Sequence, residues 1–562
     1  MRCCAQDYLL IWLALVLAGL YCRPLMPVDE TRVVSVAWDM WQRGDLLVPY
    51  LNGQPYSHKP PLLQWCIHLL WWLFGVGETP ARLAAPLFAL GNLALTAALA
   101  RRLWPDDAPT AKLAPLILLA MPVWALWTSL TLYDMPVTFF TLLGLYGIVR
   151  AAEGQDLAGW GLLALAIAGG ALAKGPVILI LILPPAFAAP WWRATMPPRG
   201  RWWGGLLGAV LAGAALALAW AVPAGLAGGA EYRQAIFWGQ SAGRISHSFA
   251  HALPFWWYFA LLPALGLPWL LWPPLWRSLR SLPLTLALSP RGEGTCSTPP
   301  NGGGADAGLR FCAIQIVVVL LVFSLISGKR VHYLLPIFPA AALCAARALS
   351  RAHPILVRRD ALAASLLLLA PALTLLLTPL AWDADRNDLA EIAAHTPLSA
   401  KLLLLGLGLA VWLWRPPTAV AGARLLAVAL LALLLTAHGV FRHIGWHYYD
   451  LQTFADHLAA VEQRGAPIAH WREYHGDFNF LGRLRQPLTE IDTRQGLLDW
   501  MQAHRQGYVV LLRPPDPALC EEGAEFAQYY RGGRRIMLWP SAALLARPGV
   551  LERLLGVGGP SP

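Results

Sequence analysis

Two adjacent acids, Asp29 and Glu30, could supply chemistry near the start of the chain. A carboxylate at the mouth of a cavity can orient an acceptor or take its proton, so both are catalytic candidates. The alternative is structural, because an acid in the first turn of a helix stabilises that helix by roughly 1 kcal/mol. A third acid, Asp134, starts a long apolar span, where it either caps the helix or meets water or a partner. We add Asp134 to the catalytic candidates.

Basic and aromatic side chains follow in the same first loop. Tyr56, His58 and Lys59 stand close together after a turn at residues 51–53. Lys174 stands in a similar place, just before a proline at the edge of an apolar span. Lysines at such an edge can simply reach towards lipid head groups. For Lys59 the flanking tyrosine and histidine favour a functional role, whereas for Lys174 both interpretations remain.

Two later loops add more cationic and aromatic groups. The first loop, residues 237–255, contains three such groups between its aromatic ends: Arg244, His247 and His251. The second follows residue 326 and contains Lys329, Arg330, His332 and Tyr333. Together with Lys59 they form a set able to bind a phosphate through charge-assisted hydrogen bonds. Histidines such as His58 and His247, with an acid, could also bind a divalent metal ion.

The pattern between residues 31 and 43 predicts the helix that positions the first two acids. Its apolar residues share one face: Val33, Ala37, Met40 and Trp41. Its polar residues lie elsewhere: Thr31, Ser35, Asp39 and Gln42. Gly44 is placed to end the helix. This pattern is typical of a helix in the membrane interface, which would hold charged groups just outside the hydrocarbon.

Composition predicts a polytopic helical membrane protein. Of the 562 residues, 57% are hydrophobic and only 13% are charged, which is more apolar than a soluble domain needs. The net charge of +11 fits arginines that keep loops in the cytoplasm, so we expect no nucleic-acid partner. The eight cysteines have no metal-ligand spacing and predict no disulfide framework.

Apolar segments predict about 13 membrane crossings, on the rule of roughly 20 residues per helix. The first, residues 8–22, lacks a small-residue cleavage site and is expected to be retained. Residues 62–74 are short and are expected to be interfacial or re-entrant. The other spans are centred in residues 81–100, 113–128, 132–149, 158–172, 175–190, 204–222, 254–273, 311–326, 332–349, 361–380, 400–414 and 423–440.

Charge predicts the orientation of these spans. With the N-terminus inside, every second loop is rich in arginine, as the positive-inside rule requires. The opposite loops contain the acids and bases named above. We therefore expect the chemistry to face outward.

The chain is expected to divide into regions along its length. Residues 1–442 would form a transmembrane domain with a catalytic first outer loop, residues 23–61. Residues 281–309, rich in Pro, Gly and Ser, are expected to be a disordered cytoplasmic insertion. Residues 443–562 are expected to form a small outer α/β domain. This domain contains no glycine-rich loop of the kind that binds nucleotides. Its expected elements are helices at 450–463 and 493–505 and strands at 466–471, 507–512 and 534–539.

An outward cationic set suits group transfer from a phosphorylated lipid. A polyprenyl phosphate is a good leaving group, so no strong general acid is needed. The site would need cations around the phosphate as negative charge builds up there. It would also need an acid near the acceptor and a fixed orientation of the two reactants. An outward site agrees with the missing nucleotide fold, because nucleotide sugars are not available outside the cytoplasm.

Several motifs resemble, in the same order, those of the polyprenyl-phosphate-dependent membrane glycosyltransferases. The motifs are DETR at 29–32, GDLLVPYLNGQPYSHKPPLLQW at 44–65, FG-x5-ARL at 74–83, AKGPV at 173–177 and SGKRVHYLLPIFPA at 327–340. The family includes the protein O-mannosyltransferases and, closer here, the bacterial lipid A 4-amino-4-deoxy-L-arabinose transferases. The resemblance covers residues 1–350. It implies a GT-C fold, an undecaprenyl-phosphate-linked sugar donor and a bacterial inner-membrane location with the site on the periplasmic side.

The resemblance also implies roles for individual residues. Asp29 matches the family's outer-loop acid, and Asp134 resembles its second acid. The residues that hold the lipid phosphate, or help to hold it, would be Tyr56, Lys59, Arg244 and Tyr333. His58 departs from the pattern, because the aminoarabinose enzymes usually have glutamate directly before this lysine. A histidine can bind a metal ion but cannot pair with a sugar ammonium as glutamate does, so the sugar and a divalent metal cofactor are left open.

These observations predict a membrane glycosyltransferase that moves a sugar from an undecaprenyl-phosphate donor to an acceptor at the periplasmic face. The acceptor would be lipid A or another surface glycan, and a protein hydroxyl is the alternative. A lipid or sugar transporter and an inactive scaffold are alternatives from other classes. Transporters place ionisable groups near the bilayer midplane, whereas here these groups stand at span edges. The oligomeric state is left open.

Overall fold

The computed structural model describes residues 2–193, 197–238, 253–281, 307–352, 354–381, 388–414, 416–513 and 523–555. The chain divides into two compact units. The first, here called the membrane unit, comprises Met1–Leu20, Ser57–Leu63 and Glu78–Val440. The second, here called the sheet unit, comprises Tyr21–Tyr56, Gln64–Gly77 and Phe441–Pro562. The predicted insertion at 281–309 lies, apart from its ends, outside the described residues.

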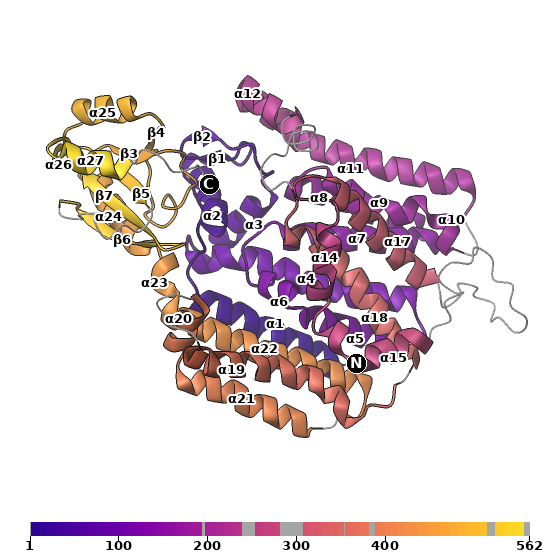
Figure 1. The fold of residues 1–562 in the computed structure, drawn as a ribbon. Helices are drawn as coiled ribbons and strands as arrows, with labels where there is room; N and C mark the ends of the chain where they lie inside the picture. The colour runs from indigo at the N-terminus through magenta and orange to yellow at the C-terminus, as the bar shows by residue number, and fades with distance from the viewer. Residues whose placement is uncertain are drawn as a thin grey trace, which may run out of the picture. The chain divides into compact units, whose positions relative to one another are not determined.

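The membrane unit is a bundle of apolar helices (Figure 1). Within the described residues, eight helical segments are long and apolar enough to cross a membrane. They are α4 (Glu78–Leu103), α7 (Asp134–Ala152), α8 (Asp156–Lys174), α11 (Arg199–Ala227), α17 (Ala307–Leu325), η3 (Val331–Ile337) with α18 (Phe338–Ala352), η4 (Arg358–Ala361) with α19 (Leu362–Ala381), and α22 (Ala419–Ile444). Shorter apolar helices of this unit are α1 (Arg2–Cys22), α5 (Ala108–Leu119), α9 (Val177–Phe187) and α21 (Leu398–Leu413). The short apolar helix α3 (Leu62–Phe74) belongs, from Gln64 onward, to the sheet unit. The predicted class of multi-pass helical membrane protein is confirmed.

Two predicted spans are interrupted. The span expected at 113–128 ends as α5 at Leu119, and a new helix, α6 (Pro122–Trp127), begins at a proline. The span expected at 254–273 is divided into α14 (Trp257–Leu265) and the short η2 (Trp269–Leu271), with Pro268 between them. A proline has no N–H to donate, so it starts a helix more readily than it continues one. The remaining short helices are α10 (Ala189–Trp192), α12 (Gly229–Gln234), α15 (Pro273–Ser281) and α20 (Asp388–His395).

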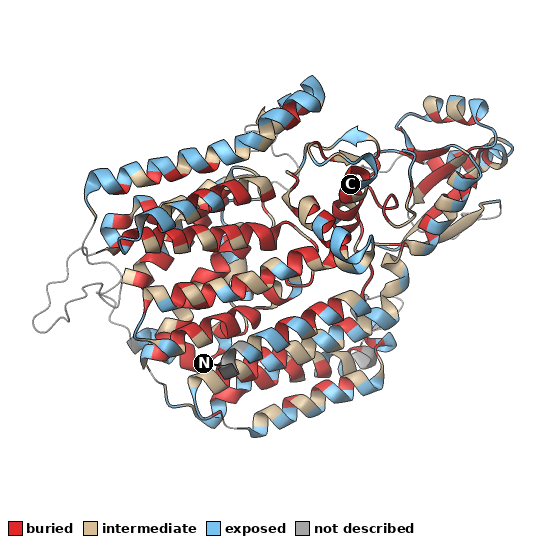
Figure 2. Ribbon diagram, turned by 180° about the vertical axis from the view of Figure 1, so that it is seen from behind, coloured by how far each residue is buried: buried red, intermediate tan, exposed pale blue. Residues whose placement is uncertain are grey.

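Small residues allow α7 and α8 to pack closely. A Cβ atom at Gly147 would lie 2.7 Å from the carbonyl oxygen of Gly159, and one at Gly159 would lie 2.4 Å from the backbone nitrogen of Ala151. Without a Cβ the two backbones can approach, which is how helices associate inside a membrane. By contrast, α11 exposes most of its apolar side chains (Figure 2), as expected for a helix that contacts lipid.

The sheet unit contains a five-stranded mixed sheet with strand order β4-β3-β5-β7-β6 (Figure 1). Its strands are β3 (Ile468–Trp471), β4 (Thr489–Ile491), β5 (Tyr508–Arg513), β6 (Phe526–Tyr530) and β7 (Arg534–Pro540). Strand β3 is parallel to β4 and β5, whereas β7 is antiparallel to β5 and β6. The helices of this part are α23 (Trp446–Tyr449), α24 (Gln452–Gln463), α25 (Arg494–Ala503), α26 (Ser541–Leu545) and α27 (Pro548–Leu555).

Both faces of this sheet are covered. Val510 and Leu538 belong to a hydrophobic cluster with α24, and Val509 and Trp539 belong to a second cluster with α25 to α27. Neighbouring residues of a strand point to opposite faces, so each strand contributes to both clusters. The predicted C-terminal α/β domain is confirmed, and the predicted strands appear as β3, β5 and β7. The short β4 and β6 were not predicted.

Helix α2 (Asp29–Arg43) also belongs to the sheet unit. It ends as predicted at Gly44, whose φ of 65° is left-handed and favours glycine. Three of its four predicted polar residues, Thr31, Ser35 and Asp39, are buried, whereas Gln42 is exposed. The chain then forms the hairpin β1 (Tyr50–Leu51) and β2 (Gln54–Pro55) around the predicted turn. Two positive φ angles at that turn are typical of a tight hairpin.

We predict that Gly159→Leu weakens the membrane unit. The added side chain would press on the backbone of α7, and overpacking of this kind typically costs about 1–3 kcal/mol. The melting temperature of the purified protein in detergent should fall by several degrees. Gly161→Leu is the matched control on the same helix, because a Cβ at Gly161 meets nothing within 4 Å. Equal melting temperatures for the two variants would contradict the close packing described above.

Candidate active site

An ion pair joins the first residue of α7 to the last residue of α8. Lys174 Nζ lies 2.6 Å from Asp134 Oδ1, and the two side chains are 16% and 7% exposed. Both residues stand at the ends of apolar helices, where a charge is unfavourable unless it has a partner or water. The pair therefore satisfies two charges at once and fixes the ends of two helices that pack along their lengths.

Two lysine ammonium groups, one of them in this pair, lie over tyrosine rings. Lys174 Nζ lies 4.7 Å from the centre of the Tyr333 ring, and Tyr333 belongs to η3. Lys59 Nζ lies 5.9 Å from the ring of Tyr133, the residue before Asp134. The face of an aromatic ring attracts a cation, so both rings help to hold a lysine in place.

His332 completes the group. Its ring stacks on Trp127 with centres 5.5 Å apart and meets the Tyr333 ring at 4.9 Å, edge to face. Lys59 and His332 are both close enough to Asp134 to act on its charge. We call Lys59, Asp134, Lys174, His332 and Tyr333 the cationic cluster.

The cationic cluster can attract an anion. Two ammonium groups and one carboxylate leave a net charge of +1 when the histidine is neutral. Ammonium groups that are partly shielded from water form short, strong hydrogen bonds to phosphate oxygens. Such groups stabilise negative charge that develops on a leaving phosphate. All members belong to the membrane unit.

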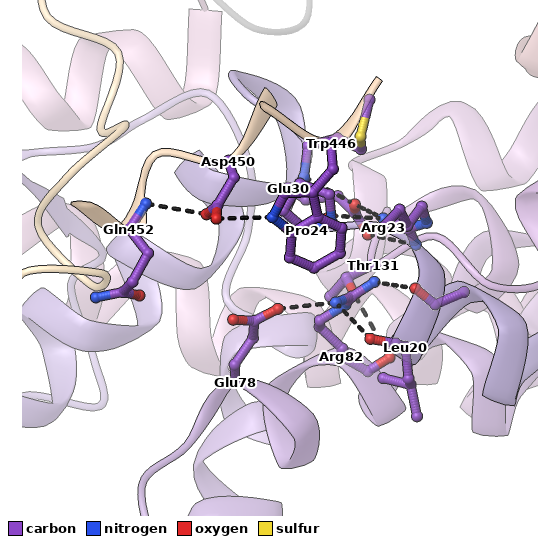
Figure 3. A network of polar contacts seen from close by, with 12 residues as sticks. Leu20, Arg23, Pro24, Glu30, Glu78, Arg82, Thr131, Trp446, Asp450 and Gln452 are labelled. Carbon is purple, nitrogen blue, oxygen red and sulfur yellow. Dashed lines mark hydrogen bonds and ion pairs between the residues drawn. The ribbon is translucent and has the colours of Figure 1, made fainter. Parts of the chain in front are cut away.

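Arg82 is a further buried charge that the sequence analysis did not single out (Figure 3). Its guanidinium, on α4, bonds the carbonyl oxygens of Gly19 and Leu20 at the end of α1, and it pairs with Glu78 at 2.8 Å. Its own carbonyl oxygen accepts a hydrogen bond from Thr131 Oγ1 at 3.4 Å. Arg82 thus connects the end of α1 with the segment just before Asp134. The position of Arg82 in the ARL motif could have identified it from the sequence as a candidate residue.

The two adjacent acids of the sheet unit differ in their surroundings. Asp29 is exposed in the first turn of α2, whereas Glu30 is 1% exposed. Glu30 pairs with Arg23 and accepts a hydrogen bond from the backbone N–H of Met26 at 3.1 Å (Figure 3). Glu30 therefore holds the start of the first loop, and Asp29 is the acid available to solvent.

Three other predicted phosphate ligands, Lys329, Arg330 and Tyr56, are held in place by hydrogen bonds that involve the backbone. Lys329 Nζ donates to the carbonyl oxygens of Leu253 and Ile326 at 2.8 and 2.6 Å, and burial lowers the pKa of this lysine. The hydroxyl of Tyr258 bonds the backbone of Arg330, which is half-buried. The backbone N–H of Tyr56 donates to the carbonyl oxygen of Pro49 at 2.7 Å and closes the hairpin.

The metal prediction has no support in the described part of the chain. There, no three His, Cys, Asp or Glu side chains lie close enough together to hold a metal ion. His58 is exposed. Arg244, His247 and His251 lie outside the described residues.

Asp39 is a buried acid that lines a cavity of about 270 Å³ in the sheet unit. Its Oδ2 accepts a hydrogen bond from the backbone N–H of Gly53 at 3.3 Å, which connects α2 to the hairpin turn. Burial raises the pKa of Asp39 from 3.8 to about 6, although the N–H of Gly53 and the charge of Arg43 oppose that effect.

The whole chain resembles solved membrane glycosyltransferases. The crystal structure of ArnT from Cupriavidus metallidurans in the apo state has a TM-score of 0.71 and 19% identity, and covers 96% of this chain and 98% of that chain. The structure of the same protein bound to undecaprenyl phosphate has a TM-score of 0.70 and covers 94% and 97%. The fold is therefore that of the GT-C membrane glycosyltransferases.

Sequence relatives define the family within that class. Residues 58–225 match the family model described as dolichyl-phosphate-mannose-protein mannosyltransferase. The undecaprenyl phosphate-α-4-amino-4-deoxy-L-arabinose arabinosyl transferase of Pseudomonas paraeruginosa PA7 is 30% identical over 526 residues, 86% of this chain and 88% of that protein. The enzyme of the same name from Pseudomonas aeruginosa LESB58 is 29% identical over 529 residues. The chain belongs to this family of polyprenyl-phosphate-dependent glycosyltransferases, which confirms the predicted family and enzyme class.

We predict that breaking the Asp134–Lys174 pair from one side destabilises the membrane unit. Asp134→Ala or Lys174→Ala leaves one charge without its partner, which typically costs about 3–5 kcal/mol. The double variant Asp134→Leu with Lys174→Met removes both charges and should regain most of the lost melting temperature. A double variant no more stable than either single variant would contradict a structural pairing.

We also predict that Asp39 makes the stability of the sheet unit depend on pH. Its folded pKa of about 6 lies above the ordinary 3.8, so the protonated acid stabilises the folded state, and this contribution is lost as pH rises through 6. Each pKa unit corresponds to about 1.4 kcal/mol, so the full effect is roughly 3 kcal/mol. Between pH 4 and 7, the range that contains most of this loss, the wild type should lose more thermal stability than Asp39→Asn, measured by melting curves. Parallel curves would show that Asp39 titrates normally.

Proposed function

We propose that the enzyme transfers a sugar from an undecaprenyl-phosphate-linked donor to lipid A, or to another surface glycan, on the periplasmic side of the inner membrane. The observation that carries the proposal is the cationic cluster, where Lys174 pairs with Asp134 and Lys59, from a distant part of the chain, lies over the ring of the preceding residue, Tyr133. Support for the donor comes from the relatives' names and from the ArnT structure bound to undecaprenyl phosphate. The alternation of arginine-rich loops supports the orientation.

We propose that the cationic cluster binds the leaving phosphate. Lys59 and Lys174 would donate hydrogen bonds to its oxygens, and the Tyr333 hydroxyl is a further donor. Asp134 would hold Lys174 in place rather than touch the phosphate, because its Oδ1 already contacts that ammonium. This arrangement stabilises charge as the bond between sugar and phosphate breaks.

We propose that Asp29 activates the acceptor hydroxyl. This carboxylate would take the proton of the acceptor hydroxyl while the hydroxyl oxygen bonds to the anomeric carbon of the sugar. In the same step the anomeric carbon separates from the phosphate oxygen, so the products are the glycosylated acceptor and undecaprenyl phosphate. A single displacement of this kind inverts the anomeric configuration.

The other candidate residues keep supporting roles in this proposal. Glu30 would position the first loop through Arg23, and Lys329 would hold the loop ends that precede η3. Tyr56, Arg330 and Arg244 remain proposed phosphate ligands, and His58 and His247 remain proposed metal ligands. The sugar tested first is 4-amino-4-deoxy-L-arabinose, because it is the sugar in the relatives' names.

We predict that Lys59→Ala and Asp29→Asn both abolish transfer. Loss of one group that stabilises the transition-state charge typically costs about 100- to 1,000-fold in rate. The assay uses the full-length protein in liposomes with the undecaprenyl-phosphate sugar and lipid A, and mass spectrometry detects the product. Lys112→Ala and Asp492→Asn are matched controls that change the same residue types outside the candidate residues, and both should keep full activity.

Three outcomes would overturn this proposal. Full activity of Lys59→Ala would remove the cationic cluster from the reaction, and full activity of Asp29→Asn would remove Asp29. Movement of the intact donor lipid across the bilayer without glycosylated product would indicate a transporter instead.

A further inference from the structure

We propose that Asp477, near the other end of the chain, is a positioning residue for the transfer reaction and acts through Thr31 of helix α2. This inference rests on the proposed function, because α2 begins with Asp29. Asp477 would not touch either substrate. Its part would be to hold the first turn of α2 in the one position from which Asp29 can take the acceptor proton.

Asp477 lies between α2 and the sheet. Its Oδ1 accepts a hydrogen bond from Thr31 Oγ1 at 3.0 Å, and its Oδ2 accepts one from the Tyr530 hydroxyl at 3.0 Å. Asp477 is 8% exposed, Thr31 1% and Tyr530 2%. The two carboxylate oxygens therefore connect the first turn of α2 directly to strand β6.

The stability of the fold does not by itself explain why a carboxylate occupies this position. Removing a carboxylate from water is unfavourable, and an apolar side chain of similar size in the same place would avoid that cost. Burial raises the pKa of Asp477, against the opposing effect of the hydrogen bonds from Tyr530 and Thr31. What the carboxylate adds is geometry, because it sets two hydroxyl groups at defined distances.

The loop that carries Asp477 is internally braced. The Tyr474 hydroxyl accepts hydrogen bonds from the backbone N–H groups of Phe478 and Asn479 at 2.7 and 3.2 Å, and it donates to Asn479 Oδ1 at 2.6 Å. Gly476 has a φ of +81°, and a Cβ there would lie 2.6 Å from the Leu51 side chain. Asp477 is thus presented by a loop with little freedom to move.

Helix α2 contacts this loop and the segment after it along one stripe. The Ser35 hydroxyl donates to the carbonyl oxygen of Gly476 at 2.8 Å, and Trp38 and Gln42 both donate to the carbonyl oxygen of Leu484 at 3.0 and 2.7 Å. With Thr31 these residues are spaced by four, three and four positions, which places them on one helical face. The helix cannot rotate or slide without breaking these bonds.

Thr31 is the member of the stripe closest to Asp29 in the sequence, so its bond to Asp477 is the stripe's contact at the catalytic end of the helix. The Glu30–Arg23 pair and a hydrogen bond from Arg32 Nε to the carbonyl oxygen of His475 at 3.3 Å also hold this turn. The other three bonds hold the helix farther along. A misplacement of about 1 Å at a reacting group can cost roughly 100-fold in rate. Loss of the Thr31–Asp477 bond should therefore affect the chemical step more than it affects folding.

The test compares Thr31→Val with Tyr530→Phe in the full-length enzyme. Each variant removes one hydroxyl from the same carboxylate, but only the first lies on α2. We expect Thr31→Val to lower kcat about tenfold or more with the KM for the donor within twofold of wild type. Thr31→Ser should restore most of that kcat. Tyr530→Phe should lower the melting temperature about as much as Thr31→Val while kcat stays within about threefold of wild type.

The outcomes separate this inference from the proposed function. If Asp29→Asn is inactive while Thr31→Val keeps the wild-type kcat, Asp477 has no positioning role and the proposed function stands. If both Thr31→Val and Tyr530→Phe lower kcat in proportion to melting temperature, the bond is merely structural and the inference fails. If Asp29→Asn is fully active, the proposed role of Asp29 fails, and the inference fails with it.

Discussion

The hydrogen-bonded ion pair between Asp134 and Lys174 is the interaction around which the membrane unit is arranged. Each charge would be unfavourable at the end of an apolar helix without the other. Their pairing fixes where α7 begins and where α8 ends, and glycines allow the two helices to pack closely in between. The same pair places an ammonium against Tyr333, so the constraint that stabilises the bundle also builds its cationic cluster.

Individual members of that cluster could be predicted from the sequence, but their pairing could not. Lys59, Asp134 and Lys174 are conspicuous because a charge at the edge of an apolar span needs a physical reason. Nothing in the sequence shows that Asp134 and Lys174 meet, since 40 residues separate them. Periodicity also predicted α2, its end at Gly44 and three strands of the sheet, because local pattern determines these elements.

Partners that are distant in sequence explain most of what the sequence analysis missed. Lys329 was considered a phosphate ligand, and its bonds to two backbone carbonyl oxygens have no sequence signal. The polar residues of α2 were assigned to a membrane interface, although Thr31 and Ser35 bond a loop more than 400 positions away. Hydrophobic periodicity distinguishes apolar from polar faces, but it does not show what a polar face contacts.

The grouping of the first loop with the end of the chain has a consequence for biosynthesis. Thr31 and its carboxylate partner are 446 positions apart, so the ribosome completes every membrane span before it makes the residues that α2 needs. The first loop therefore cannot pack against these partners until translation is nearly finished. A messenger RNA truncated after the codons of α22 would therefore still encode the membrane spans. The first loop of that shortened protein would lack the residues against which α2 packs.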